Sequence, residues 1–153
     1  MDALNIGSRS SDWRARRLSN FSDDDVVLDE VKVASVEGFI QGIKFPEGDP
    51  RRSQAFTATG FEAKRLGKGS LRSFVWWKGQ QIVFGSSEHH HLIERAIRAK
   101  FDQNSVARAA LIATDSLRLT HDLGHPESPH TSLPSRVFCD ILTRIRQELL
   151  GAR

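Results

Sequence analysis

Hydrophobic residues recur every three or four positions in one short segment, residues 35–45. Four of them have the i, i+3, i+4, i+7 spacing that places side chains on one face of a helix: Val36, Phe39, Ile40 and Ile43. Ser35 is a good N-cap, and Phe45 followed by Pro46 ends the pattern. The segment therefore predicts a short helix that buries this face in a core.

Two hairpins and several further helices are predicted along the rest of the chain. Alternating apolar residues between Asp24 and Val33 predict one hairpin, and two strands joined at Lys78-Gly79 predict the second. Apolar residues at helical spacing mark these segments: 49–57, 60–66, 86–101, 104–114 and 134–151. The polar, basic residues 1–17 are predicted to form a loop. We expect an α+β, predominantly α-helical single domain over residues 18–150, with five or six helices and no parallel sheet.

The amino-acid composition narrows the class of protein but does not indicate a specific function. The chain has 153 residues, of which 39% are hydrophobic, and this predicts one soluble globular domain. No apolar run approaches the ~20 residues that span a membrane, so a cytoplasmic protein without membrane contact is expected. Cys139 is the single cysteine and is predicted to be a buried structural thiol. The net charge of +3 permits an anionic ligand and does not by itself indicate nucleic-acid binding.

A second set of residues follows the flank of the predicted helix at 35–45. Glu37, Gln41 and Lys44 recur at i, i+4 and i+7, so a carboxylate, an amide and an amine line up over ~10 Å at a rise of ~1.5 Å per residue. Such a line could act on one substrate. The alternative is that Glu37 and Lys44 are solvated surface charges, as most charges on an amphipathic helix are.

Several familiar site motifs fail on their spacing. Residues 66–70 bring glycines near a lysine and a serine but lack the phosphate-loop pattern. Adjacent helical residues point ~100° apart, so His89, His90 and His91 cannot all bind one metal ion. His90 and Glu94 leave a weak i, i+4 metal pair open, although polar residues of a first helical turn explain them better. No metal and no cofactor is expected.

A set of short motifs in a fixed order resembles the NADAR superfamily, the YbiA-like N-glycosidases. The resemblance covers roughly residues 18–150 and rests on these segments: Leu18-Ser19-Asn20-Phe21, Ser35-Val36-Glu37, Gln41-Gly42-Ile43-Lys44-Phe45, Ala63-Lys64-Arg65-Leu66-Gly67 and Ala96 to Asn104. Any one motif is weak, but the ordered set is quite specific. It favours a functional role for Glu37 and Lys44 over the surface-charge alternative.

The resemblance implies a compact, mainly helical fold that binds ADP-ribose-like or phosphoribosyl compounds and cleaves N-glycosidic bonds. By match, Glu37 would be the acidic catalytic residue and Lys44 the amine facing the anomeric carbon. The residues that would bind substrate are Asn20, Phe21, Ser35, Gln41, Lys64, Gly67 and Asn104. Lys64, Arg65 or Lys68 would hold a diphosphate.

The second half of the site departs from the family pattern. Members that act on riboflavin-pathway intermediates have a Trp before the long helix and a W-G-D element after the following one. Here the two regions read Phe84-Gly85-Ser86 and Thr120 to Gly124. The departure argues against a riboflavin-type substrate, and Asp122 or His121 would replace the missing acid.

The expected function is removal of ADP-ribose from a nucleobase, with ADP-ribosylated guanine in DNA or a derived nucleotide as substrate. The alternatives are hydrolysis of a phosphoribosylated riboflavin-pathway intermediate and a non-catalytic module that binds ADP-ribose or nucleic acid. If the substrate is DNA, the basic segments are expected to contact its phosphates, with a salt-dependent affinity. These segments contain Arg14, Arg16, Arg17, Arg51 and Arg52.

Overall fold

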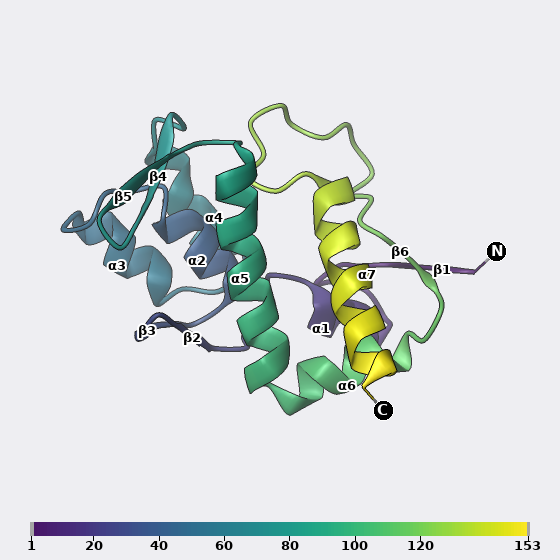
Figure 1. The fold of residues 1–153 in the computed structure, drawn as a ribbon. Coiled ribbons are helices and arrows are strands. Elements are labelled where there is room, and N and C mark those ends of the chain that lie inside the picture. The colour runs from purple at the N-terminus through teal and green to yellow at the C-terminus, as the bar shows by residue number, and fades with distance from the viewer. Residues whose placement is uncertain (1, 153) are drawn as a thin grey trace.

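The computed structural model describes residues 2–152 and confirms an α+β, helix-rich domain (Figure 1). Its helices are α1 (Trp13–Leu18), α2 (Val36–Gly42), α3 (Pro50–Phe56), α4 (Gly60–Leu66), α5 (Ser87–Gln103), α6 (Ser105–Ala113) and α7 (Ser135–Gly151), with a 3-10 turn at Gly67–Gly69. Its strands are β1 (Ala3–Asn5), β2 (Val26–Leu28), β3 (Val31–Val33), β4 (Phe74–Trp77), β5 (Gln80–Val83) and β6 (Arg118–Thr120). They form three two-stranded sheets.

Both predicted hairpins are present, β2–β3 and β4–β5. Each turns through two residues with positive φ, Asp29 and Glu30 in the first and Lys78 and Gly79 in the second. Two successive residues with positive φ match the right-handed twist of the flanking strands, so tight turns of this kind favour hairpins. The second hairpin leads directly into α5, which Ser86 caps by accepting a hydrogen bond from the backbone N–H of His89.

The N-terminal segment differs from the loop predicted for residues 1–17. It contains β1 and most of α1, so the structure has seven α-helices within residues 2–152 instead of five or six. Strand β1 pairs in parallel with β6, with Leu4 opposite Leu119, and this corrects the expectation of no parallel strands. Three-residue strands whose partners lie more than a hundred residues apart leave no local pattern, because only tertiary pairing stabilises them.

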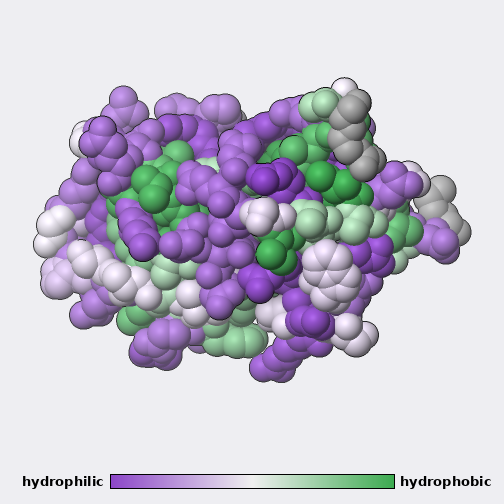
Figure 2. Space-filling model, turned by 90° about the horizontal axis from the view of Figure 1, so that it is seen from below, coloured by the Kyte–Doolittle hydropathy of each residue, from purple (hydrophilic) through white to green (hydrophobic). Residues whose placement is uncertain are grey.

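Residues of α2, α5, α6 and α7 form much of the core, and the long helix α5 stands between α2 on one side and α7 on the other (Figure 1). Seen from below, polar residues cover most of that face and hydrophobic residues show in separate patches (Figure 2). No helix within residues 2–152 is long and apolar enough to cross a membrane. Cys139 is only half-buried on α7, and burial, followed by the nearby Asp140, raises the pKa of its thiol to about 11.

Helix α2 ends earlier than predicted, at Gly42, and Lys44 lies in the turn that follows it. The helix packs closely on α3 through its two glycines. A Cβ atom added at Gly38 would lie 2.6 Å from the carbonyl oxygen of Ala55 and 2.7 Å from that of Ala58, and one added at Gly42 would meet the ring of Phe56. This packing fixes the helix that carries the candidate site.

Replacing Gly38 by alanine should therefore destabilise the fold. The added methyl group meets backbone oxygens that cannot move aside, and overpacking of this kind costs about 1–3 kcal/mol. Urea unfolding of Gly38→Ala measures the loss. Gly7→Ala is the control, because a Cβ at Gly7 meets nothing within 4 Å and should change the free energy of unfolding by less than about 0.5 kcal/mol. Equal stability of the two variants would contradict the close packing of α2 on α3.

Candidate functional site

The start of α2 is fixed by two residues of the predicted site. Ser35 Oγ accepts a hydrogen bond from the backbone N–H of Gly38 at 2.9 Å and donates one to the carbonyl oxygen of Ala58 at 3.0 Å. The backbone N–H of Glu37 donates to the carbonyl oxygen of Asn20 at 3.0 Å. Ser35 is thus engaged as a helix cap, and the Asn20-Phe21 segment lies directly against the first turn of α2.

Glu37 is buried, with only 8% of its surface exposed. Its Oε2 atom accepts a hydrogen bond of 2.6 Å from Nε2 of Gln41, one turn further along the helix. Burial raises the pKa of the Glu37 carboxyl, and the Gln41 hydrogen bond and the charges of Lys44 and Lys64 oppose this rise. A carboxyl group with a raised pKa can carry a proton closer to neutral pH and exchange it with a substrate.

Lys44 is buried as well, with 7% of its surface exposed. Burial lowers the pKa of its amine to about 8, and the charges of Arg72 and Lys64 act in the same direction while Glu37 acts against them. The structure thus brings together the acid and the amine that the sequence placed on one flank. They are buried side chains and not the solvated surface charges of the alternative interpretation.

The absence of a side chain at Gly67 leaves space for the side chain of Gln41. A Cβ atom at Gly67 would overlap the Gln41 amide oxygen and would lie 2.7 Å from its Cδ atom. Gly67 is buried at the end of α4, where a larger residue would force Gln41 out of the position from which it bonds Glu37. The close approach explains why a glycine stands at this point of the predicted site.

A cationic rim borders the buried pair. We use this name for Lys64 and Arg72, which are exposed and whose charges act on Lys44. Arg65, another residue considered for a diphosphate, is paired with Glu62 at 2.6 Å on the surface of α4. Two exposed cations of this kind can attract an anionic group to this part of the surface.

Three other predicted residues have hydrogen-bond partners that do not include Glu37, Gln41 or Lys44. Asn104 joins α5 to α6 and donates to the carbonyl oxygens of Asp25 and Lys100, which makes it a structural link. Asp122 is exposed, and its backbone is tied to Asn5 on β1. The Nδ1 atom of His121 lies 3.2 Å from Ser135 Oγ. Burial lowers the pKa of this imidazole, the charge of Glu127 opposes the lowering, and the charge of Lys64 adds to it.

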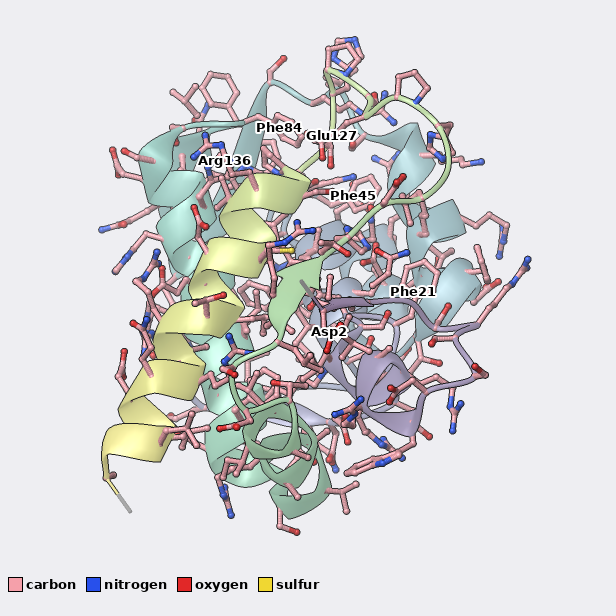
Figure 3. All side chains as sticks on the ribbon, turned by 90° about the vertical axis from the view of Figure 1, so that its right-hand side faces the viewer. Asp2, Phe21, Phe45, Phe84, Glu127 and Arg136 are labelled. Carbon is pink, nitrogen blue, oxygen red and sulfur yellow. The ribbon has the colours of Figure 1, made fainter. Side chains whose placement is uncertain are left out.

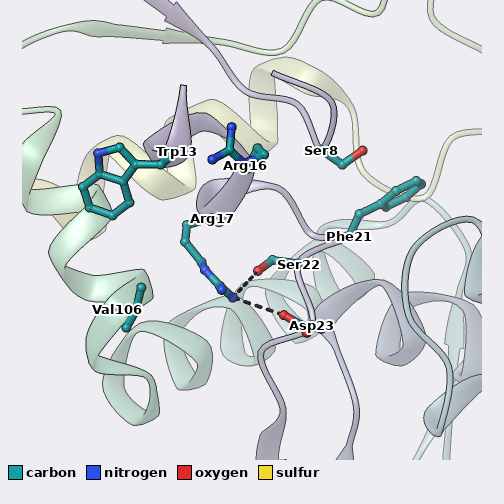
Figure 4. A pocket seen from close by; sticks show the side chains of 8 residues that line it. All are labelled: Ser8, Trp13, Arg16, Arg17, Phe21, Ser22, Asp23 and Val106. Carbon is teal, nitrogen blue, oxygen red and sulfur yellow. Dashed lines mark hydrogen bonds and ion pairs between the residues drawn. The ribbon is translucent and has the colours of Figure 1, made fainter. Parts of the chain in front are cut away.

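Phe21 faces a hollow that contains neither Glu37 nor Lys44. The hollow has a volume of about 470 Å³ and is lined by Ser8, Trp13, Arg16, Arg17, Phe21, Ser22, Asp23 and Val106 (Figure 4). Arg17 bonds Ser22 and Asp23 across it. Phe21 also makes an edge-to-face contact with Phe61 at 4.8 Å between ring centroids. Phe21 therefore lines a surface hollow that is separate from the buried Glu37 and Lys44 side chains.

The arginines expected at DNA phosphates are bound within the protein. Arg14 pairs with Asp12, Arg17 with Asp24, and Arg51 with Asp49. The remaining two donate to backbone carbonyl oxygens, Arg16 to Ser10 and the buried Arg52 to Phe45 and Trp76.

The sequence did not assign His89 to the site. It is fully buried at the beginning of α5, and its pKa is lowered to about 4 by burial first, then by the charges of His90 and Lys44. Position 89 extends the apolar i, i+3, i+4, i+7 stripe formed with Leu92, Ile93 and Ala96, and this signal could have separated it from His90 and His91. Within residues 2–152 no three metal-binding side chains come together.

Several buried polar atoms have no hydrogen-bond partner among the described residues. Within residues 2–152 they are Asn20 Oδ1, Gln41 Oε1, Ser70 Oγ, His89 Nε2 and Ser132 Oγ. Such groups are rare in folded proteins, and each calls for an explanation. Asn20 and Gln41 both contact Glu37, and Ser70 follows the turn that contains Gly67. In Figure 3, Phe84, which follows β5, and Glu127 of the loop before α7 are seen toward the same end of the molecule.

Comparison with known proteins identifies the family. Residues 12–147 match the family described as bacteriophage protein GP30.3. The chain is 28% identical over 142 residues to the "uncharacterized 17.1 kDa protein in Gp30-rIII intergenic region" of Enterobacteria phage T4, covering 90% of this chain and 93% of that protein. The NMR structure of E. coli YbiA matches 99% of this chain and 86% of its own with a TM-score of 0.70 at 21% identity, which shows a shared fold. The chain therefore belongs to the bacteriophage protein GP30.3 family, within the NADAR superfamily.

Proposed function

We propose that this protein is an N-glycosidase that hydrolyses the C1–N bond between ADP-ribose and a nucleobase, with guanine in DNA or a derived nucleotide as the base. The observation that carries this proposal is the buried group of Glu37, Gln41 and Lys44 beside the cationic rim. The family resemblance supplies the substrate class, and the buried acid and amine supply groups suited to its chemistry.

Cleavage of a C1–N bond develops positive charge on the sugar and leaves the electron pair of the bond on the base. A carboxylate near C1 stabilises the sugar charge, and a proton must reach the base. Water contributes atoms to both products. Its oxygen forms a bond to C1, one of its protons remains on the new hydroxyl group, and the other passes to the base. Glu37 would carry that proton, because a carboxyl group with a raised pKa can alternate between acid and carboxylate.

Lys44 provides a covalent route when the glycosyl amine opens to an imine. Its neutral amine adds to C1, the base leaves with a proton, and a Schiff base remains between Lys44 and the sugar. Water then adds to C1 and releases the aldehyde form of ADP-ribose together with the free amine. A pKa of about 8 makes roughly 10% of the amine neutral at pH 7, compared with well under 1% for an ordinary lysine.

The cationic rim would receive the diphosphate of the substrate. Lys64 and Arg72 border Lys44, and a diphosphate bound there would place the attached ribose over the buried amine. Exposed Lys64 and Lys68 would also meet the backbone of a DNA substrate. A non-catalytic module could bind the diphosphate with the cationic rim alone. It would have less use for a buried acid and a buried amine.

Incubation with three ligands tests the proposal. The protein is mixed in parallel with an oligonucleotide bearing ADP-ribosylated guanine, with the phosphoribosylated riboflavin-pathway intermediate and with ADP-ribose, and products and binding are measured by mass spectrometry and calorimetry. Release of ADP-ribose from the oligonucleotide is expected. Turnover of the riboflavin-pathway intermediate alone would assign the alternative substrate, and binding of ADP-ribose without any turnover would assign a binding module.

Gly67→Ala should lower turnover without unfolding the protein. The added methyl group displaces the Gln41 amide, so Glu37 loses its only side-chain hydrogen bond among the described residues and shifts in the site. Small misplacements of a catalytic group cost ~10²-fold in rate. Gly69→Ala is the matched control, because its Cβ meets Arg51 Nη1 at an ordinary 3.5 Å. Comparable kcat values for the two variants would contradict this role for Gln41.

A further inference from the structure

His89 has a buried ring nitrogen for which residues 2–152 provide no hydrogen-bond partner. The residue is the third of α5 and is 0% exposed. Its backbone N–H donates to Ser86 Oγ at 3.2 Å, and its ring packs against Phe84 with 4.9 Å between the centroids. The imidazole is therefore held in one orientation by the helix cap and by an aromatic neighbour.

Hydrogen bonding determines which ring nitrogen carries the proton. The backbone N–H of Gly85 donates to Nδ1 of His89 at 2.9 Å, so Nδ1 must be the unprotonated acceptor. The proton of the neutral ring is then on Nε2. Burial, together with the charges of His90 and Lys44, lowers the pKa of this imidazole to about 4, so the ring stays neutral at pH 7. Nε2–H is thus a fixed neutral donor, and within residues 2–152 it has no acceptor.

The charges around Lys44 indicate which part of a substrate this donor would meet. The charges of the rim residues Lys64 and Arg72 act on Lys44, and the charge of Lys44 acts on His89. Lys44 therefore lies within electrostatic range of both the cationic rim and the imidazole. A diphosphate belongs at the rim, where positive charge is exposed. A neutral N–H beside the Phe84 ring suits an uncharged acceptor attached to a flat ring, which is the chemistry of a nucleobase carbonyl.

We propose that His89 Nε2–H donates a hydrogen bond to a carbonyl oxygen of the leaving base and stabilises the charge that this base gains as the C1–N bond breaks. The inference rests on the proposed N-glycosidase function and adds to it the group that holds the leaving base. The electron pair of the broken bond moves onto the base nitrogen and is shared with the carbonyl oxygen, where the donor lies. His89 keeps its proton, and the proton that the base takes up comes from Glu37 or water.

A neutral imidazole is well suited to this role. It does not compete with the base for a proton, and it offers its hydrogen bond without the reorganisation that a mobile water needs. Preorganised donors directed at developing negative charge are worth ~10²–10³-fold in kcat in other enzymes. Because the site is closed to solvent at His89, the interaction would be stronger than the same bond in water.

Two variants separate the donor from the structural role of the ring. His89→Asn can place an amide oxygen near the Nδ1 position and keep the bond from Gly85, but it removes the donor at Nε2. His89→Gln can place an amide N–H near the Nε2 position and loses the Gly85 bond instead. Expected results are a fall of kcat by ~10²-fold or more in His89→Asn, a smaller fall in His89→Gln, and unchanged affinity of His89→Asn for ADP-ribose, which lacks the base.

A measurement without a His89 variant keeps the test independent of folding. In Glu37→Gln protein, the imidazole Nε2–H signal of His89 should shift on binding the oligonucleotide that bears ADP-ribosylated guanine and not on binding ADP-ribose. Three outcomes would overturn the role of His89 while leaving the glycosidase intact. The first is a wild-type kcat in His89→Asn, and the second is a loss of its affinity for ADP-ribose as large as its loss of kcat. The third is an Nε2–H signal that does not shift when the modified oligonucleotide binds. A wild-type protein that releases no ADP-ribose would overturn the proposed function, and the role of His89 with it.

Discussion

Glu37→Gln should lower the turnover of ADP-ribosylated guanine by ~10²-fold or more and leave the fold intact, as expected when an acid–base group is removed. Glutamine has the same shape, and its amide oxygen can still accept the hydrogen bond that Gln41 donates at 2.6 Å. Because burial disfavours the charged carboxylate, the neutral replacement should not lower the free energy of unfolding. Turnover with the oligonucleotide and urea unfolding are the two measurements.

Glu62→Gln is the matched control for this prediction. Glu62 lies on the surface of α4, where it pairs with Arg65 and does not reach the buried centre. Its replacement should leave both turnover and affinity near wild-type values. Near-normal turnover in Glu37→Gln, with the control also active, would remove Glu37 from the chemistry.

Borohydride added during turnover should trap Lys44 on the sugar. Reduction of the Schiff base adds the ADP-ribosyl mass to the peptide that contains Lys44, and Lys44→Ala should give no adduct and little turnover. The pKa of about 8 predicts more trapping as the pH rises from 6 to 8, because deprotonation produces the nucleophilic amine. Peptide mass spectrometry at several pH values measures the adduct.

Lys64→Ala distinguishes covalent attack from phosphate binding. Lys64 is exposed on the rim, so its loss should weaken the affinity for ADP-ribose while the adduct on Lys44 still forms at saturating substrate. A fully active wild-type protein that yields no adduct would favour direct attack by water activated through Glu37. That result would leave Lys44 a binding role and retain the glycosidase.

Local sequence patterns could predict the part of the fold that carries the acid and the amine. The i, i+3, i+4 spacing and the Ser35 cap fix α2, and α2 presents Glu37 and Gln41 on the same side. The turn residues Lys78 and Gly79 fix the second hairpin for the same local reason. Such signals succeed because the interactions that stabilise these elements lie within a few residues of each other.

What the sequence could not predict depends on distant contacts. Strand β1 exists because it pairs with β6, and Asn104 is a structural link because Asp25 happens to lie beside it. The sequence offered no sign of partners for Arg14, Arg16 and Arg17, but in the folded chain each of the three has a carboxylate or carbonyl partner. His89 looked like one of three polar histidines until burial separated it from His91.

The most direct test of the account is the mass of the DNA product after incubation with the wild-type protein. Hydrolysis of the C1–N bond should return an oligonucleotide with unmodified guanine and release intact ADP-ribose, and Glu37→Gln should leave the substrate unchanged over the same time. Cleavage within the diphosphate would instead leave phosphoribose on the guanine. An oligonucleotide that keeps its full ADP-ribose, or one that keeps phosphoribose, would contradict an N-glycosidase built on Glu37 and Lys44.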